Sequence, residues 1–406
     1  MNIAAVNLGC KVNHVELEEF VGRALETGAS LVGLSEADVI LINTCTVTGE
    51  AERKTRKAVN RALAANPHAG VILTGCSVAI NPEAYRAIDP RISVVPKNEV
   101  EACLQALGTD AASAHEQELS ASSGLFRSRT GIKIQDGCDN ACTFCIVHTA
   151  RGPARSLPRA VILDQAARLV EAGRHEIVLT GINLGSYADE QGRLASLVRD
   201  ILQVAEELGA RESVRLRLSS IEPTDIEDDL VELMAASGGR ICRHLHIPLQ
   251  SGSTKVLRDM DRRYDADWFA EMIRSLRTII PQIALSTDCI VGFPGETEED
   301  FEDTCALCRA AGFSKIHVFP YSPRSGTPAA SRTDQVPAQT KQERAKRLRD
   351  LSAELRAADF ALRIGSTESV IAEGDGFGMT ESYHRIPVPA GTPTGALIRC
   401  TLEMLE

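Results

Sequence analysis

The sequence lacks three features, each of which would have pointed to a particular class of protein. No apolar run in its 406 residues is long enough to cross a bilayer. The start, Met-Asn-Ile-Ala-Ala-Val-Asn, lacks the basic-then-apolar form of a signal peptide. The formal net charge of -11 argues against a generally basic surface that coats nucleic acids, although a local basic patch is still possible. We therefore expect a cytoplasmic protein with no membrane and no DNA partner.

The composition is that of a soluble globular protein, with 44% apolar and 24% charged residues. A chain of this length exceeds one ordinary core, so we expect two or three domains. Its twelve cysteines would not usually form a disulfide framework, because a reducing cytosol keeps thiols free. Clustered cytosolic cysteines are more often metal or redox sites, and the cysteines therefore guide the functional interpretation.

The first hundred residues alternate strand and helix patterns. β-rich runs at residues 3–8, 39–42 and 71–73 are separated by helical stretches at 14–26 and 50–65. This β-α-β-α-β pattern favours a parallel sheet. Each β-rich run is followed within two or three residues by a cysteine, and we call these cysteines the N-terminal set: Cys10, Cys45 and Cys76. They should converge, because the carboxyl ends of parallel strands share one edge, unless three small residues simply end three strands.

A second set of cysteines, the loop set, stands close together in sequence at Cys138-x3-Cys142-x2-Cys145. A loop this tight can supply three thiolates to one iron–sulfur cubane and leave its fourth iron open to a ligand that is not protein. Zinc sites usually use cysteine pairs with a distant second pair, which this loop lacks. A zinc or purely structural site is the alternative.

From residue 131 a second alternating series begins. Its six β-rich runs are at residues 132–134, 176–179, 214–218, 244–247, 283–290 and 315–319. Helical patterns, such as 164–171 and 194–208, separate them. Six strand–helix units are too few for a full eight-stranded barrel, so we predict an open partial barrel with its chemistry in the loops after the strands.

The C-terminal part begins with a predicted helix over residues 341–363, whose first half is basic. That half is either a solvated face or an RNA-backbone contact. Short β-like runs at 369–372, 396–398 and 400–402 predict a small antiparallel barrel. This tail is awkward for a nucleic-acid module because only Arg385 and Arg399 offset its acidic residues, which are Glu368, Glu373, Asp375, Glu381, Glu403 and Glu406.

The loop set, followed by Arg151-Gly152, resembles the radical S-adenosylmethionine (SAM) superfamily. That resemblance implies that the open iron binds SAM, which is cleaved to a 5'-deoxyadenosyl radical. The segments Gly9–Asn13, Asn43–Thr48 and Thr74–Cys76 resemble the methylthiotransferases, and 11–13 with 45–48 resemble their MtaB type. The resemblance covers nearly the whole chain.

The resemblance also implies the domain organisation of an α/β protein. Residues 1–108 would form a Rossmann-like methylthiotransferase domain with a parallel sheet, and 109–129 a linker. Residues 130–364 would form a radical SAM core, a partial (β/α)6 TIM-like barrel, and 365–406 a shortened TRAM-like β domain.

The implied cofactors are SAM and two [4Fe-4S] clusters, the radical-generating one on Cys138, Cys142 and Cys145 and the sulfur-handling one on Cys10, Cys45 and Cys76. The implied partners are tRNA and an electron donor of the flavodoxin or ferredoxin type. The implied reaction adds a methylthio group to C2 of N6-threonylcarbamoyladenosine at position 37 of tRNA. The alternatives are isopentenyladenosine-37 of tRNA, an aspartate of ribosomal protein uS12 and, remotely, an iron–sulfur electron-transfer protein without SAM chemistry.

Polar residues after the barrel strands are the remaining site candidates. The resemblance makes Asn183, Ser219, Glu222 and Gln250 expected SAM contacts, with loop capping as the alternative, and we identify no protein acid or base. Residues 292–296 would face the adenine of SAM or form a strand-end turn. Arg215 and Arg217 would bind the SAM carboxylate or line the barrel.

Other candidates are predicted to be structural. We expect His244 and His246 to point to opposite faces of one strand and not to share a metal. We expect buried free thiols at Cys103, Cys242, Cys289, Cys305, Cys308 and Cys400.

Overall fold

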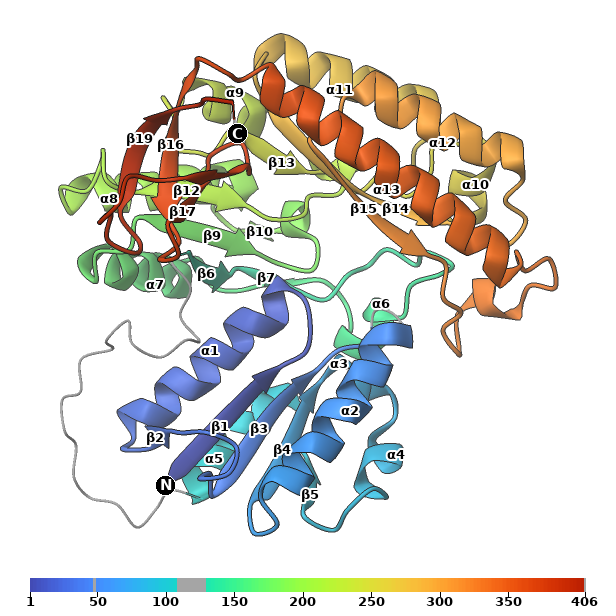
Figure 1. Ribbon diagram of the computed structural model, residues 1–406. Helices are drawn as coiled ribbons and strands as arrows, with labels where there is room; N and C mark the ends of the chain where they lie inside the picture. Colours follow the sequence, from blue (N-terminus) through green and yellow to red (C-terminus); the bar gives the residue numbers. More distant parts are fainter. Residues whose placement is uncertain (47–48, 108–128, 405–406) are drawn as a thin grey trace. The chain divides into compact units, whose positions relative to one another are not determined.

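The computed structural model describes residues 1–46, 49–107 and 129–404, and these form two compact units. Unit 1 contains the chain up to residue 107 together with Gly137–Asp139 and Cys145–Pro153. Unit 2 contains residues 129–136, Asn140–Phe144 and the chain from Ala154 onward (Figure 1). The expected linker at 109–129 lies outside the described residues, except for Arg129, and so do Val47 and Thr48.

Unit 1 is built on a five-stranded sheet in the order β2-β1-β3-β4-β5, with every pair parallel. Its centre consists of the three expected strands, β1 (Asn2–Asn7), β3 (Val39–Thr44) and β4 (Gly70–Gly75). All six residues of β3 are buried, as is typical of a central parallel strand covered on both faces. The edge strands β2 (Ser30–Leu31) and β5 (Ile92–Val94) were not predicted, because each is too short to show a pattern.

Helices cover both faces of this sheet. Alternate strand residues, such as Ile3 and Leu41, pack in one core with α1 (Lys11–Glu26) and α5 (Val100–Leu107). The residues between them, such as Ile40 and Ile42, pack in a second core with helices on the other face: α2 (Gly49–Ala65), α3 (Cys76–Ile80) and α4 (Pro82–Arg86). The period of two along each strand therefore produces the three-layered α/β unit.

Unit 2 is built on six parallel strands that pair in chain order: β6 (Thr130–Lys133), β9 (Glu176–Thr180), β12 (Arg215–Leu218), β13 (His244–His246), β14 (Ala284–Val291) and β15 (Lys315–Pro320). They form two three-stranded parallel sheets, β6-β9-β12 and β13-β14-β15. Parallel bridges from Leu216 to Ile241 and from Ser220 to His246 join the two sheets. The predicted open six-stranded partial barrel is confirmed.

The apolar sides of these strands pack against the helices. Leu216, Leu285 and Val291 belong to one large core with residues of the surrounding helices. Those helices are α7 (Arg159–Glu171), α8 (Leu194–Glu207), α9 (Asp228–Ala236), α11 (Ala266–Ile279), α12 (Glu298–Ala311) and α13 (Ala338–Ala361), and α10 (Thr254–Asp259) follows β13. Intervening residues such as Arg217 and Asp288 therefore point to the inner side of the barrel.

Two short antiparallel strand pairs interrupt this pattern. The strands β10 (Ala188–Asp189) and β11 (Gly192–Arg193) form a small hairpin. The strands β7 (Gln135–Asp136) and β8 (Arg155–Ser156) stand on either side of the cysteine loop in sequence and pair with each other. Arg155 Nη2 donates to Asp136 Oδ2 over 2.8 Å, so the two ends of the loop are held together.

The tail forms a four-stranded antiparallel sheet within unit 2, and Figure 1 draws it in red beside β9 and β12. Its order is β18-β17-β16-β19, with β16 (Thr367–Ala372), β17 (Phe377–Thr380), β18 (Arg385–Pro387) and β19 (Leu397–Thr401). The runs predicted at 396–398 and 400–402 are one strand. The strands β17 and β18 were not among the predicted runs.

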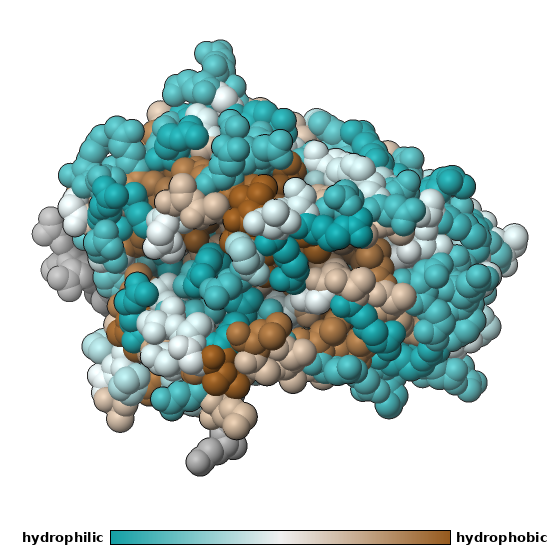
Figure 2. Space-filling model, turned by 90° about the horizontal axis from the view of Figure 1, so that it is seen from above, coloured by the Kyte–Doolittle hydropathy of each residue, from teal (hydrophilic) through white to brown (hydrophobic). Residues whose placement is uncertain are grey.

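No described helix is both long enough and apolar enough to span a membrane. The longest helix among the described residues, α13, has 24 residues and carries charges along its length. Figure 2 shows a face of the molecule on which hydrophilic residues predominate and apolar residues gather in smaller patches.

Candidate active site

The N-terminal set lies at one edge of the unit 1 sheet. Cys10 caps α1 just after β1, Cys45 directly follows β3, and Cys76 is the first residue of α3, next to β4. The three strands are neighbours and remain in register to their carboxyl ends, where Asn7 pairs with Asn43. Burial raises the pKa of the Cys10 thiol, although the residue retains exposed surface, and the charge of Arg151 offsets part of that rise.

Two asparagines from the N-terminal motifs fix this edge. Asn13 Nδ2 donates to the carbonyl of Thr44 over 2.8 Å, and Asn43 Nδ2 donates to the carbonyl of Asn13 over the same distance. Asn13 Oδ1 lies 3.5 Å from Cys10 Sγ. Gly75 has φ +100°, and a Cβ there would lie 2.4 Å from the Thr44 carbonyl oxygen, so only glycine fits before Cys76.

A buried arginine stands beside the N-terminal set. Arg151 is the last residue of α6 (Val147–Arg151), which belongs to unit 1, and its side chain is 1% exposed. Its Nε donates to Cys76 Sγ over 3.2 Å, and its Nη1 donates to Glu16 Oε1 over 2.9 Å. Lys97 also pairs with Glu16. A fixed guanidinium next to a thiolate would offset the negative charge of a cluster and hydrogen-bond its sulfur, which tunes its potential.

The parts of the cysteine loop that belong to unit 1 are held by backbone bonds. Cys138 N donates to the carbonyl of Gly152 over 3.1 Å, and Val147 N donates to Cys145 Sγ over 3.4 Å. Gly137 has φ +71°, and a Cβ there would lie 1.9 Å from the carbonyl oxygen of Pro153. The chain before Cys138 therefore approaches the returning strand as closely as only glycine permits.

In unit 2 a second buried arginine stands beside Cys142. Arg262 Nη1 donates to Cys142 Sγ over 3.4 Å, and Nη2 pairs with the carboxylate of Glu222. The hydroxyl of Tyr264 accepts from Nη2 of the same guanidinium over 2.9 Å. These residues line a small cavity of about 10 Å³, together with Asn140, Thr224, Asp261 and Arg263. Sequence reasoning missed Arg262, because nothing local links it to a cysteine 120 positions earlier.

The four expected SAM contacts all lie just after barrel strands. Asn183 Nδ2 donates to Asp225 Oδ2 over 2.5 Å, and its Oδ1 accepts from the backbone of Glu222 over 3.4 Å. The hydroxyl of Ser219 is buried and has no hydrogen-bond partner in the described part of the chain. Gln250 has φ +68°. Its backbone N–H donates to the carbonyl of Asp288, and its carbonyl accepts from Ile290 N, both on β14. Their role in SAM binding remains a prediction.

Arg215 and Arg217 were expected to bind SAM or to line the barrel, and they line its inner side and join it to the tail. Arg215 Nε and Arg217 Nε each donate to Glu176 over 2.7 Å. Their remaining nitrogens donate to tail carbonyls at 2.6–3.0 Å, including those of Met379 and Thr380. Burial alone would raise the pKa of Glu176, but the charges of Arg217 and Arg215 outweigh it and lower the pKa to about 2.

The prediction that His244 and His246 point to opposite faces was wrong. Residues two apart on a strand share a face. Both rings lie 2.9 Å from the same atom, Ser286 Oγ. His246 also faces Asp288 and His317, and the potential ligand atoms of these three residues lie within 4.8 Å of one another.

The segment 292–296 is a strand-end turn. Gly292 N and Arg344 Nη1 both donate to Glu296 Oε1, over 2.8 and 2.7 Å. Arg347 pairs with Glu298, so two basic residues of α13 contribute to ion pairs with the start of α12. An RNA contact by the rest of this basic stretch stays a prediction.

The remaining six cysteines are free thiols. Those of the barrel are buried as predicted, namely Cys242, Cys289, Cys305 and Cys308. Cys103 and Cys400 are only half-buried, because each lies where its helix or strand packs on one side alone.

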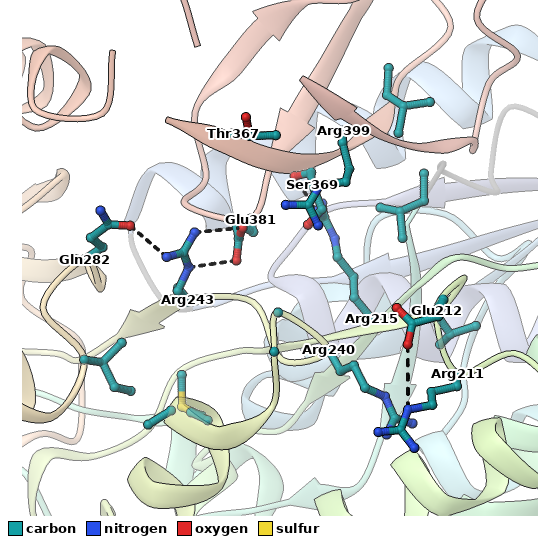
Figure 3. A pocket seen from close by; sticks show the side chains of 18 of the residues that line it. Arg211, Glu212, Arg215, Arg240, Arg243, Gln282, Thr367, Ser369, Glu381 and Arg399 are labelled. Atoms are coloured by element: carbon teal, nitrogen blue, oxygen red, sulfur yellow. Dashed lines mark hydrogen bonds and ion pairs between the residues drawn. The ribbon is translucent and has the colours of Figure 1, made fainter. Parts of the chain in front are cut away.

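Figure 3 shows a large cavity of about 810 Å³. It lies at the amino ends of the barrel strands, opposite the loops that carry the expected SAM contacts. Arg211 and Arg215 line it from the amino end of β12, and Arg240 and Arg243 from the amino end of β13. The tail supplies its other wall, and Arg243 donates to Glu381 of the tail over 3.0 Å. The amino ends of barrel strands usually serve stability, so we assign this cavity to the seam between barrel and tail.

Comparison with known proteins agrees with this geometry. Residues 132–308 match the radical SAM superfamily, and residues 2–96 match a family described as uncharacterized protein family UPF0004. Among solved structures, the chain is similar to the radical SAM methyltransferase TsrM from Kitasatospora setae, with a TM-score of 0.57 at 16% identity. That match covers 81% of this chain and 77% of TsrM, and it concerns the fold alone.

Curated relatives are much more similar in sequence. The threonylcarbamoyladenosine tRNA methylthiotransferase MtaB of Bacillus subtilis is 38% identical, over 93% of this chain and 86% of that protein. The MtaB protein of Rickettsia prowazekii is 35% identical, over 99% and 94%. The tRNA-2-methylthio-N(6)-dimethylallyladenosine synthase of Endomicrobium trichonymphae is 34% identical, over 92% and 89%. The chain therefore belongs to the radical SAM methylthiotransferase family, whose cofactors are SAM and two [4Fe-4S] clusters.

Proposed function

We propose that this chain adds a methylthio group to C2 of N6-threonylcarbamoyladenosine at position 37 of tRNA. The observation that carries the proposal is the pair of cysteine sites, each with a buried arginine that donates to one sulfur. Relatives named for this substrate match over most of both chains, which supports the choice of base.

The residues present fit two clusters. The N-terminal set supplies three thiols at one sheet edge, and the loop set supplies three within eight residues. When bound, the clusters would supply the electron that cleaves SAM and the sulfur that enters the product. Arg151 and Arg262 would neutralise charge beside them, and Asn183, Ser219, Glu222 and Gln250 would hold the polar groups of SAM.

The acidic tail is less of an obstacle to RNA binding than its composition suggests. Arg363 lies 3.3 Å from Glu368, Arg243 lies 3.0 Å from Glu381, and both carboxylates are almost fully buried. Glu373 pairs with Arg129 and Arg385, and Asp375 also pairs with Arg385. Four of the six tail carboxylates are therefore neutralised within unit 2 rather than presented to phosphates.

The proposal extends to the setting of the reaction. We infer a cytoplasmic enzyme that receives electrons from a flavodoxin- or ferredoxin-type protein, because each SAM cleavage consumes one electron from a low-potential cluster. The relatives named dimethylallyladenosine synthases favour isopentenyladenosine-37 of tRNA as the second candidate substrate. An aspartate of ribosomal protein uS12 is a third.

The test uses the full chain, reconstituted anaerobically with iron and sulfide and supplied with SAM and dithionite. It is incubated with tRNA that carries threonylcarbamoyladenosine, with tRNA that carries isopentenyladenosine, and with unmodified tRNA. Nucleosides are analysed by mass spectrometry. We expect the methylthio product only from the first tRNA. Product from the isopentenyl tRNA alone would replace the proposed substrate, and SAM cleavage without product from any tRNA would refute a tRNA substrate.

A further inference from the structure

The inner side of the barrel carries a group of three polar residues on neighbouring strands, which we call the inner triad: His246 on β13, Asp288 on β14 and His317 on β15. The outer side of β14 is occupied by apolar packing, and Cys289 Sγ lies 3.9 Å from Cys308 Sγ of α12. In register, His246 pairs with Ser286, and Asp288 pairs with His317. The triad therefore shares one inward face.

The inner triad is close-set but open. His246 Nε2 lies 3.3 Å from Asp288 Oδ1, and the His246 and His317 rings meet edge to face with centroids 5.6 Å apart. The side chains of His246 and Asp288 are 14% and 30% exposed, and His317 is exposed. Polar groups on the inner side of a barrel that retain access to solvent are able to meet a ligand there.

The residues below the triad hold it in place. Ser286 Oγ lies 2.9 Å from His246 Nδ1 and 2.9 Å from His244 Nε2. His244 is buried and stacks on Tyr383 of the tail, with ring centroids 4.8 Å apart. The Arg217 guanidinium lies over the Tyr383 ring, 4.8 Å from its centroid.

This support determines what the triad presents. His246 has one ring nitrogen against Ser286 and the other against Asp288, so its ring is fixed. Asp288 supplies hydrogen-bond acceptors, and His317 supplies either a donor or an acceptor according to its tautomer. Such a set matches the polar edge of an N6-substituted adenine, where N1 accepts and the one remaining N6–H donates. Enzymes that modify bases take the target base out of its stack and recognise it by hydrogen bonds of this kind.

We propose that the inner triad binds the polar edge of the target purine, with Asp288 and His317 as specificity-determining contacts and His246 as the residue that positions Asp288. This inference rests on the proposed function and deepens it. It also gives the tail a role in the barrel, since Tyr383 and His244 support the triad from below. The competing occupant is a divalent transition metal, because two imidazoles and a carboxylate also form metal sites.

The test compares Asp288→Asn and His317→Phe with the wild type in the tRNA assay described above. His175→Ala is the matched control, since His175 is a half-buried histidine of the same unit whose side chain bonds only the Ser213 carbonyl among the contacts described. Each protein is assayed for iron and sulfide content, for 5'-deoxyadenosine formed without tRNA, and for 5'-deoxyadenosine per methylthio product with tRNA. The control should match the wild type in every measurement.

We expect both variants to keep their clusters and their SAM cleavage without tRNA. Methylthio product should fall by about 10- to 100-fold, with the deoxyadenosine consumed per product rising in parallel, because a misplaced base wastes radicals. Three results would overturn the inference: unchanged product and ratio, loss of clusters in both variants, or one zinc, manganese or extra iron per chain that Asp288→Asn removes. If the wild type itself makes no product from any tRNA, the proposed function fails, whereas an active wild type with unaffected variants removes only this inference.

Discussion

The two arginines beside the two cysteine sets are built alike. Arg151 in unit 1 donates to Cys76 and pairs with Glu16. Arg262 in unit 2 donates to Cys142 and pairs with Glu222. In both sites a guanidinium that cannot lose its proton sits between a cysteine sulfur and a carboxylate, so each sulfur has a fixed positive neighbour.

The carboxylates of the two sites differ in how exposed they are. The Glu16 side chain is 2% exposed, and Lys97 pairs with it as well as Arg151. The Glu222 side chain is 14% exposed and lines a small cavity beside Cys142. A sealed carboxylate keeps the charge beside the N-terminal set constant, whereas an accessible one can exchange its partner for a ligand. We therefore expect SAM to exchange with the Glu222–Arg262 pair beside the loop set, and the charge of Glu16 beside the N-terminal set to stay fixed.

The largest predicted effect separates the two cysteine sets. The variant Cys138→Ala/Cys142→Ala/Cys145→Ala should lose both SAM cleavage and product completely. The variant Cys10→Ala/Cys45→Ala/Cys76→Ala should keep forming 5'-deoxyadenosine but make no methylthio nucleoside, because only sulfur supply is removed. Chromatography of both products checks this, and SAM cleavage by the first variant would contradict the division of roles.

Replacing Arg151 beside the N-terminal set should destabilise the protein more than replacing Arg262 beside the loop set. Arg151→Gln leaves Glu16 buried with Lys97 as its main partner, so the unfolding free energy should fall by about 3–5 kcal/mol. The reduction potential of the N-terminal cluster should also fall, because a positive neighbour is lost. Arg262→Gln should lower the unfolding free energy by only about 1–2 kcal/mol, since water can solvate Glu222. It should also weaken SAM binding, because Glu222 loses the arginine that positions it. Denaturant unfolding and a redox titration measure these effects, and equal losses for the two variants would contradict the comparison.

A third arginine–carboxylate group, Glu176 with Arg215 and Arg217, has no described contact with either cysteine set. It therefore shows what such a group contributes to stability without a cluster beside it. The pKa of Glu176 is about 2 in the folded protein, below its ordinary value of 4.5. Its ionisation therefore contributes stability that is complete above pH 4.5 and is lost as the pH falls toward 2, on the order of 3 kcal/mol. Glu176→Gln should destabilise the protein strongly at pH 6 and less at pH 3, without lowering cluster content. A pH-independent difference in urea unfolding would contradict this assignment.

The smallest effect belongs to an exposed arginine. Arg347 pairs with Glu298 and Glu302 across α13 and α12, and all three side chains are about half exposed. Arg347→Ala should change the unfolding free energy by less than about 1 kcal/mol and leave cluster content intact, because water screens such pairs. A thermal melt that shows a loss as large as that of Arg151→Gln would mean that burial is not what distinguishes the two arginines.

The sequence predicted the framework of both sites because their signals are local. A cysteine two or three residues beyond an apolar run needs only the parallel-sheet rule to be placed at an edge, as Cys10 and Cys76 show. Arg262 could not be predicted, since its contact with Cys142 exists only after folding. Arg151 had a weak signal, as it lies six residues after Cys145, but its target Cys76 lies 75 positions away. The tail contacts of Arg217 were equally hidden, and the two histidines were misplaced because the strand period was applied wrongly.

The central claim is that each cysteine set holds its own [4Fe-4S] cluster, and Mössbauer spectroscopy combined with iron and sulfide analysis tests it most directly. The wild type and the two triple-alanine variants are reconstituted anaerobically under the same conditions. We predict about eight irons per chain in the wild type and about four in each variant, with SAM altering the spectrum only when Cys138, Cys142 and Cys145 are present. A triple variant that retains all the iron of the wild type, or a wild type that holds a single cluster, would contradict the account.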